Sequence, residues 1–265
     1  MDWLQTVVLA LVQGLTEFLP VSSSAHLILA PRLFGWADQG QAFDVAVHVG
    51  TLAAVVTYFH QQLWAMARDW VRSLVALVPV GQSQLAWAVI WGTVPAGLCG
   101  VLLGDVVEQH LRSPVVIAAA TIGFGLVLWW ASVRPEGARD EQALRWSDVL
   151  IIGVAQALAL IPGTSRSGIT ITAGLMLGLR AKAAARFSFL LSVPIIAAAG
   201  CLHSLGLIKR GAQADWTAVG LGALVAAMSA FACIHLFLVL LDRIGMLPFV
   251  IYRLLLGVAL LVLFW

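Results

Sequence analysis

Charged residues are scarce in this chain. Lysine, arginine, aspartate and glutamate together make up 11% of its 265 residues, whereas soluble domains carry about 25%. Hydrophobic residues make up 61%, and the mean hydropathy is +0.97. A soluble core could not enclose this much apolar surface. The composition therefore excludes a soluble globular protein and predicts an all-α polytopic membrane protein.

Cysteines are also few, and they form no pattern. Cys99, Cys201 and Cys233 lie in apolar stretches, where they are expected to pack as small hydrophobic side chains. Their spacing fits neither a metal site nor a disulfide framework. The N-terminus lacks the basic segment of a cleaved signal peptide, so the first hydrophobic stretch is expected to remain. The net charge of +2 gives no sign of nucleic-acid binding, and we expect no such partner.

Polar residues concentrate in two stretches. In the first, Gln13 and Glu17 are four positions apart and share one helix face. Pro20 then ends that helix, and the following serines can cap a new one. The second stretch, residues 160–170, repeats this order with Pro162 before Arg166. Helix N-termini in apolar surroundings attract anions, so the two stretches are predicted to form halves of one phosphate-handling site.

Each polar stretch interrupts segments that are too short to cross a bilayer. Leu4–Leu19 would reach roughly 24 Å as a helix, short of the ~30 Å hydrocarbon core. It is predicted to form a re-entrant helix–loop–helix with Val21–Phe34, and Val149–Ile161 to form another with Ile169–Leu179. Gln61–Gln84 is expected to be a connection. Three predicted spans follow each pair: Ala42–Phe59, Leu85–Leu103 and Val115–Val133 in the first half, and Phe187–Ile208, Ala218–Leu241 and Leu247–Trp265 in the second.

The two halves align weakly at an offset near 142–144 residues. Short, proline-interrupted segments at matching positions of two halves indicate a binding site at a repeat interface. We therefore predict one integral membrane domain over residues 1–265. It consists of an inverted-topology repeat, with repeat 1 at about 1–133 and repeat 2 at about 148–265. Each half is a re-entrant helix–loop–helix followed by three transmembrane helices.

Basic residues distribute unequally between the two predicted sides. One side receives ten: Arg68, Arg72, Arg134, Arg139, Arg145, Arg180, Lys182, Arg186, Arg243 and Arg253. The other receives four: Arg32, Arg112, Lys209 and Arg210. The positive-inside rule makes the first side cytoplasmic and places both termini outside.

Two ionisable residues inside membrane segments are the foremost candidates for function. An intramembrane charge costs about 2.5–3.5 kcal/mol or more, so Glu17 and Arg166 indicate a functional site. Two alternatives involve no function: Glu17 lies at the membrane interface and is simply hydrated, or the two residues form a structural ion pair. A planar guanidinium suits phosphate because it binds oxygens bidentately.

Small polar residues surround these two charges. Those predicted to bind phosphate, or else merely to cap helices, are Ser22, Ser24, Thr164, Ser165, Ser167 and Thr170, and Gly163 allows close backbone approach. His26 lies one helical turn beyond the serines and could be a general acid or base, although a lone histidine more often packs structurally. His48 and His203 are expected to be structural.

These motifs resemble those of the undecaprenyl-diphosphate phosphatase family, the bacitracin-resistance proteins. The resemblance rests on Gln13-x-x-x-Glu17, on Pro20-Val21-Ser22-Ser23-Ser24-Ala25-His26 and on Pro162-Gly163-Thr164-Ser165-Arg166-Ser167-Gly168-Ile169-Thr170. It extends over essentially the whole chain, including Pro248-Phe249-x-x-Tyr252-Arg253. The family's serine motif often reads Ser-Ser-Thr-Gly-His, from which Ser-Ser-Ser-Ala-His departs mildly.

The resemblance implies hydrolysis of a C55 polyprenyl diphosphate at the outer face of the bacterial inner membrane. It implies a divalent cation, Mg²⁺ or Ca²⁺, with Glu17 and Gln13 as candidate ligands. Ser23 matches the family's second serine and is the expected nucleophile, with Glu17 or His26 as its base and Arg166 stabilising the phosphoryl charge. The lipid and the bilayer are the expected partners. The oligomeric state stays open, and a homodimer is among the assemblies that the sequence allows.

The alternatives to this function are another type of lipid phosphatase and a lipid transporter. A phosphatidic-acid-phosphatase-like enzyme is disfavoured because the chain lacks a Lys-x6-Arg-Pro opening and a His-x3-Asp pair after Ser165-Arg166. A polyprenyl-phosphate flippase or transporter remains compatible with the inverted repeat, because broken helices suit alternating access.

Overall fold

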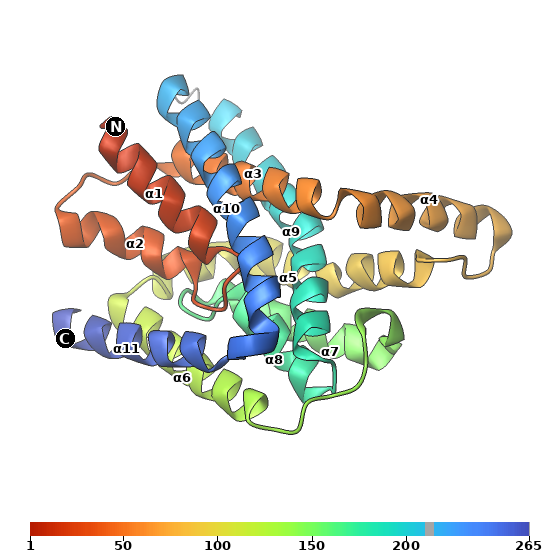
Figure 1. Ribbon diagram of the computed structural model, residues 1–265. Helices are drawn as coiled ribbons and strands as arrows, with labels where there is room; N and C mark the ends of the chain where they lie inside the picture. The colour runs from red at the N-terminus through yellow and green to blue at the C-terminus, as the bar shows by residue number, and fades with distance from the viewer. Residues whose placement is uncertain (210–214, 265) are drawn as a thin grey trace.

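The computed structural model describes residues 1–209 and 215–264, and it is helical throughout. Its helices are α1 Trp3–Thr16, α2 Ser23–Phe34, α3 Gln41–Tyr58, α4 His60–Ala76, α5 Ser83–His110, α6 Pro114–Ser132, α7 Trp146–Ala157, α8 Arg166–Met176, α9 Ala181–Lys209, α10 Trp216–Ile244 and α11 Leu247–Phe264. Two short 3₁₀ turns cover Glu141–Ala143 and Leu158–Leu160. Figure 1 shows both chain ends on the same side of the molecule, with α4 projecting on the other.

Five helices in the described part of the chain, α5, α6, α9, α10 and α11, are long and apolar enough to cross a membrane. A sixth span arises if α3 and α4, which meet at a bend of 79°, count together. By contrast, α1 and α7 are apolar but too short to cross. The prediction of an all-α polytopic membrane protein is thus confirmed.

The segment predicted as a connection, Gln61–Gln84, is largely helical and holds most of α4. The helix buries Met66, Asp69 and Ser73 on one face. Trp70 packs edge-on against Trp87 of α5, with ring centroids 5.6 Å apart. Arg68 and Arg72 are exposed on other faces of the same helix, so α4 is amphipathic.

One arginine in the charge count does not lie in water. Arg253 is fully buried, with 0% of its surface exposed, so it belongs to neither aqueous side. Arg210, assigned to the opposite side, lies outside the described residues, as does Trp265 at the end of the last predicted span. The remaining excess of basic residues on the predicted cytoplasmic side does not depend on these positions.

Contacts between distant segments separate two ends of the helical body. At one end, the N-terminal amine lies 3.6 Å from Asp215, and the Gln41 amide lies 2.8 Å from His203 Nδ1. At the other end, Arg186 pairs with Glu141 at 2.8 Å. Lys182 pairs with Asp242 at 3.1 Å at that same end. Each pairing joins chain segments that the prediction of six spans places on the same side of the membrane.

Glycines let helices of the two halves approach closely. A Cβ on Gly14 of α1 would lie 2.6 Å from the Ala226 carbonyl of α10. A Cβ on Gly153 of α7 would lie 2.8 Å from the Gly92 carbonyl of α5. Such small residues are how membrane helices gain packing without a hydrophobic driving force between them. In the seam between α3 and α10, Gly50 of α3 faces the Ala223 carbonyl of α10.

This seam gives a prediction about stability. Gly50→Ala would bring a methyl group to 2.2 Å from the Ala223 carbonyl oxygen, an overpacking that typically costs about 1–3 kcal/mol. Gly97→Ala in α5 is the matched control, because no atom lies within 4 Å of its Cβ position. We expect a lower melting temperature in detergent for Gly50→Ala alone. Equal melting temperatures would show that the seam can relax.

Candidate active site

Two loops meet inside the helical body, and both hold a serine in a strained conformation. Ser22 immediately precedes α2 with φ +74°, and Ser165 immediately precedes α8 with φ +70°. A non-glycine residue in this region costs of the order of 1–3 kcal/mol and persists only where the surroundings hold it. We call residues 17–22 loop 1 and residues 161–165 loop 2.

Glu17 is the centre at which the loops join. Its Oε2 accepts hydrogen bonds from Gln13 Nε2 at 3.0 Å and from Ser23 Oγ at 2.7 Å. Its Oε1 lies 3.2 Å from Nη2 of Arg166 in the other half. The carboxylate is 8% exposed, so the structure brings together the residues that the sequence predicted to cooperate.

Arg166 is held on both sides. Its Nη1 donates to the Ser188 carbonyl at 2.8 Å while Nη2 faces Glu17. Its side chain is 13% exposed. The structural ion pair between Arg166 and Glu17 is therefore present. Phosphate binding by the guanidinium remains a prediction.

The three serines at the junction of loop 1 and α2 differ in environment. Ser23 is half-buried and directs its hydroxyl to Glu17. Ser22 is buried, Ser24 is exposed, and their hydroxyl oxygens lie 3.2 Å apart. Of these three serines, Ser23 is thus the one whose hydroxyl donates to a carboxylate.

The polar residues around loop 2 are mostly engaged with protein. Ser165 Oγ caps α8 by accepting from Gly168 N at 3.1 Å and lies 3.2 Å from Ser167 Oγ. Ser167 donates to the Leu19 carbonyl of loop 1 at 2.8 Å. Thr170 donates to Ser188 Oγ at 2.8 Å. These hydroxyl groups join loops and helices, so their contact with phosphate stays a prediction.

Thr164 and Gly163 complete loop 2. The hydroxyl of Thr164 is buried without a hydrogen-bond partner. Gly163 has φ +95°, and a Cβ there would lie 2.3 Å from the Ile117 carbonyl of α6. Loop 2 therefore requires glycine at this position both for its backbone conformation and for its approach to α6.

Both ring nitrogens of His26 contact groups other than the Ser23 hydroxyl. Its Nδ1 lies 2.7 Å from the Ser22 carbonyl, an acceptor, so this nitrogen carries the proton and donates. Its Nε2 lies 2.6 Å from the Tyr252 hydroxyl, and the two rings stack with planes 8° apart. The imidazole thus ties α2 to α11, while the hydroxyl of Ser23 faces Glu17.

His48 is a site residue that the sequence analysis missed. Its Nε2 lies 3.9 Å from Glu17 Oε2, and its Nδ1 donates to the Asp44 carbonyl at 2.7 Å. With 37% of its side chain exposed, it connects the buried carboxylate to the surface. The only sequence signal was an ionisable residue near the start of a span, and nothing in its spacing linked it to Glu17. His203 lies apart from this centre, against Gln41.

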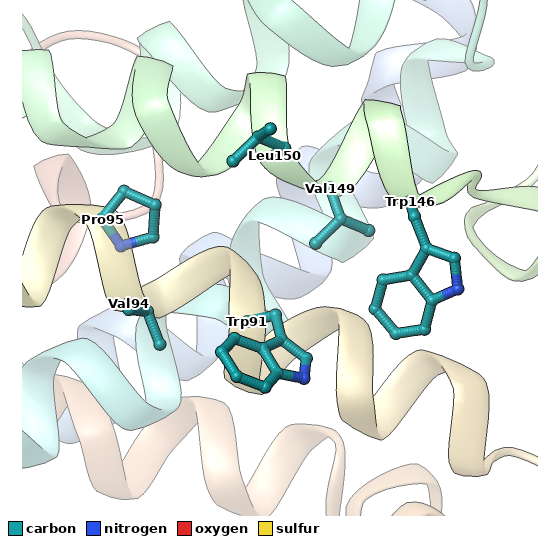
Figure 2. A pocket seen from close by; sticks show the side chains of 6 residues that line it. All are labelled: Trp91, Val94, Pro95, Trp146, Val149 and Leu150. Atoms are coloured by element: carbon teal, nitrogen blue, oxygen red, sulfur yellow. The ribbon is translucent and has the colours of Figure 1, made fainter.

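An open apolar groove of about 210 Å³ lies between α5 and α7. Figure 2 shows its lining side chains, which are Trp91, Val94, Pro95, Trp146, Val149 and Leu150. None of them belongs to the polar centre around Glu17. The groove therefore offers surface for hydrocarbon and no group for chemistry.

The fold and the polar centre define a class: a multi-pass membrane protein with a buried carboxylate, serine and arginine brought together by two broken helical pairs. Comparison with known families is more specific. Residues 6–259 match the bacitracin resistance protein BacA family, and the chain belongs to that family.

Individual relatives agree with this assignment over their full length. The chain is 64% identical to "Undecaprenyl-diphosphatase 2" of Stutzerimonas stutzeri (strain A1501), over 100% of this chain and 99% of that protein. It is 60% identical to "Undecaprenyl-diphosphatase" of Thioalkalivibrio sulfidiphilus and 58% identical to that of Nitrosococcus oceani, each over 100% of both chains.

Proposed function

We propose that this protein is a membrane phosphatase that hydrolyses undecaprenyl diphosphate to undecaprenyl phosphate and inorganic phosphate. It thereby recycles the cell-wall lipid carrier and confers resistance to bacitracin. The observation that carries the proposal is the contact of Ser23 Oγ with the Glu17 carboxylate, which is itself paired with Arg166. Similarity to undecaprenyl-diphosphatases over the whole chain supports the choice of substrate.

In the first step, Ser23 Oγ attacks the terminal phosphorus and its proton passes to Glu17 Oε2, 2.7 Å away. The anhydride P–O bond breaks, and its electron pair leaves with undecaprenyl phosphate. Once protonated, Glu17 no longer neutralises Arg166. The guanidinium charge then becomes available to the phosphoryl oxygens as negative charge builds up there.

In the second step, water attacks the phosphoserine. The Ser23 oxygen leaves and recovers the proton from Glu17, and the proton of the attacking water leaves with inorganic phosphate or solvent. Glu17 is the base in this scheme because it already accepts from Ser23, whereas both ring nitrogens of His26 face other groups. His26 then acts by holding α2 in place.

The residues around Glu17 fit a divalent cation that binds together with the diphosphate. Gln13 Oε1 is buried without a hydrogen-bond partner, an oxygen beside the carboxylate that a cation could use. Within the described residues, no cluster of three histidine, cysteine or acidic side chains could hold a metal alone. Gln13 and the ionised Glu17 would therefore hold Mg²⁺ or Ca²⁺ together with phosphate oxygens as substrate binds, and Gln13 and the phosphate oxygens would keep the cation once Glu17 has taken the proton of Ser23. When bound, the cation would neutralise part of the diphosphate charge.

We further propose that the chain is one domain built as an inverted repeat of about 1–133 and about 148–265. Several matched features support it. Ser22 and Ser165 share a positive φ and immediately precede α2 and α8. Gln13 and Gln156 are both buried, each with an unpartnered amide oxygen. In the same way, α1 packs on α10 as α7 packs on α5.

The function is tested by phosphate release in detergent from C15 and C55 polyprenyl diphosphates. We expect release by the purified protein that falls when a chelator is added. Glu17→Gln should lower turnover by about 10²-fold or more, because a positioned base contributes about 10²–10⁴-fold. Ser23→Ala removes the nucleophile and should abolish turnover. Ser132→Ala is the control, since Ser132 lies at the end of α6 and donates to the Trp129 carbonyl, outside the polar centre. A folded wild-type protein that releases no phosphate would instead favour a transporter.

The role of Arg166 is tested with two variants. Arg166→Lys keeps the charge but loses the planar fork, so we expect a severe loss of turnover from it and a larger one from Arg166→Ala. Melting temperature and phosphate release are measured on the same preparations. If lysine restores turnover, and alanine lowers turnover only in proportion to stability, the arginine is a structural partner of Glu17 and does not bind phosphate.

We propose that the protein lies in the inner membrane with its site open to the periplasm, as the basic-residue count and the pairing of loops at each end support. Ala37→Cys and Ala138→Cys, both at exposed positions, are introduced into a variant without its three native cysteines. We expect an impermeant thiol reagent added outside intact cells to label only the first. Labelling of the second alone would reverse the orientation.

A further inference from the structure

Arg253 is a fully buried cation whose partners are all backbone carbonyl groups. Its Nε donates to Thr121 O at 3.1 Å, and its Nη1 donates to Thr164 O at 2.8 Å and Pro20 O at 3.3 Å. Its Nη2 donates to Gly163 O at 2.9 Å and Ala120 O at 3.4 Å. A guanidinium has five N–H groups, so each of them has an acceptor.

These carbonyl groups belong to three separate parts of the chain. Pro20 lies in loop 1, Gly163 and Thr164 lie in loop 2, and the other two carbonyls lie in α6. Arg253 has no carboxylate partner among the ion pairs of the described residues. A buried unpaired charge is costly, so this arrangement is unusual for a side chain that serves packing alone.

We propose that Arg253 is a positioning residue for the phosphatase reaction, which locks loop 1 to loop 2 and thereby holds Ser23 and Arg166 on Glu17. The inference rests on the proposed function. Arg253 does not touch the reacting atoms. It acts by donating hydrogen bonds to backbone carbonyl groups of both loops.

The geometry explains how a distant side chain can do this. Thr164 immediately precedes the strained Ser165, so a hydrogen bond to the Thr164 carbonyl fixes the peptide plane between them. In a trans peptide the N–H points opposite to the carbonyl, so the Ser165 N–H points away from Arg253. The Pro20 carbonyl is fixed in the same way shortly before Ser22.

The neighbouring residue strengthens the arrangement. Tyr252 contacts His26 of α2 through its hydroxyl at 2.6 Å. Adjacent residues of α11 thus hold the helix that carries Ser23 and the two loops beside it. Gly168 of α8 packs against the guanidinium, where a Cβ would lie 2.8 Å from Nη1.

The test uses Arg253→Lys and Arg253→Met. An ammonium group keeps the charge but offers three donors from a single atom, so it cannot span carbonyls of three segments, and methionine offers none. The control is Val250→Ala, a buried position on the same helix whose apolar side chain offers no hydrogen-bond donor to either loop. All variants are purified in detergent and checked for melting temperature before assay.

We expect Arg253→Lys to lose about 100-fold in kcat, as displacement of catalytic groups by about 1 Å can cause, with KM little changed. Val250→Ala should lower the melting temperature yet keep kcat. The proposal is overturned if lysine restores kcat, or if the control loses as much activity at equal melting temperature.

A second measurement does not depend on activity. Hydrogen exchange followed by mass spectrometry should show faster exchange in residues 17–24 and 161–168 of Arg253→Lys than in wild type, and no such change in Val250→Ala. Unchanged exchange in both segments would refute the positioning role. If the wild type released no phosphate but the exchange result held, the phosphatase function would fail while the locking of the loops stood.

Discussion

The contact between Glu17 and Arg166 is the constraint on which the rest of the centre depends. Each is an ionisable group inside an apolar body, where an isolated charge costs about 2.5–3.5 kcal/mol or more. At 3.2 Å each supplies the partner that the other needs. Because they come from opposite halves, the cost of separating them holds the halves in one arrangement. A buried ion pair adds little to net stability, so its value here is in specifying which segments meet.

The helical body supplies the stiffness that this contact requires. Helices of the two halves approach through glycines, and loop 2 packs on α6 through Gly163. Serines with positive φ immediately precede α2 and α8. Hydrogen bonds of neighbouring groups hold these strained serines in place, such as the bond that Ser167 donates to the Leu19 carbonyl. Rigidity of the surroundings thus permits a conformation that an isolated loop would abandon.

In the proposed reaction, the charge available from Arg166 changes when Glu17 is protonated. Arg166 is neutralised while Glu17 is ionised, and it gains an unbalanced charge when Glu17 takes the proton of Ser23. Positive potential therefore rises as the phosphoryl group begins to transfer. The buried setting strengthens this effect, because charges interact more strongly where water is excluded.

Much of this protein is determined by its sequence alone. Long apolar runs predict helices that cross the bilayer, and shorter apolar runs predict helices that do not cross it alone, because a bilayer tolerates no unpaired backbone. Glycine, proline and serine at the breaks predict the loops, and the charges of Glu17 and Arg166 identify the centre. These features depend on local chemistry and on period, which can be read from neighbouring residues.

Only the tertiary structure decided the rest. The sequence predicted residues 61–84 as a connection, and the structure shows that α4 occupies most of it. His48 proved to lie beside Glu17, His26 to face Tyr252, and Arg253 to lie among carbonyl groups of loops far away in sequence. Each of these depends on which segments meet, and the hydrophobic pattern that drives helices into a membrane does not encode the rotation of one helix against another. That rotation is set by side-chain packing between residues far apart in the chain.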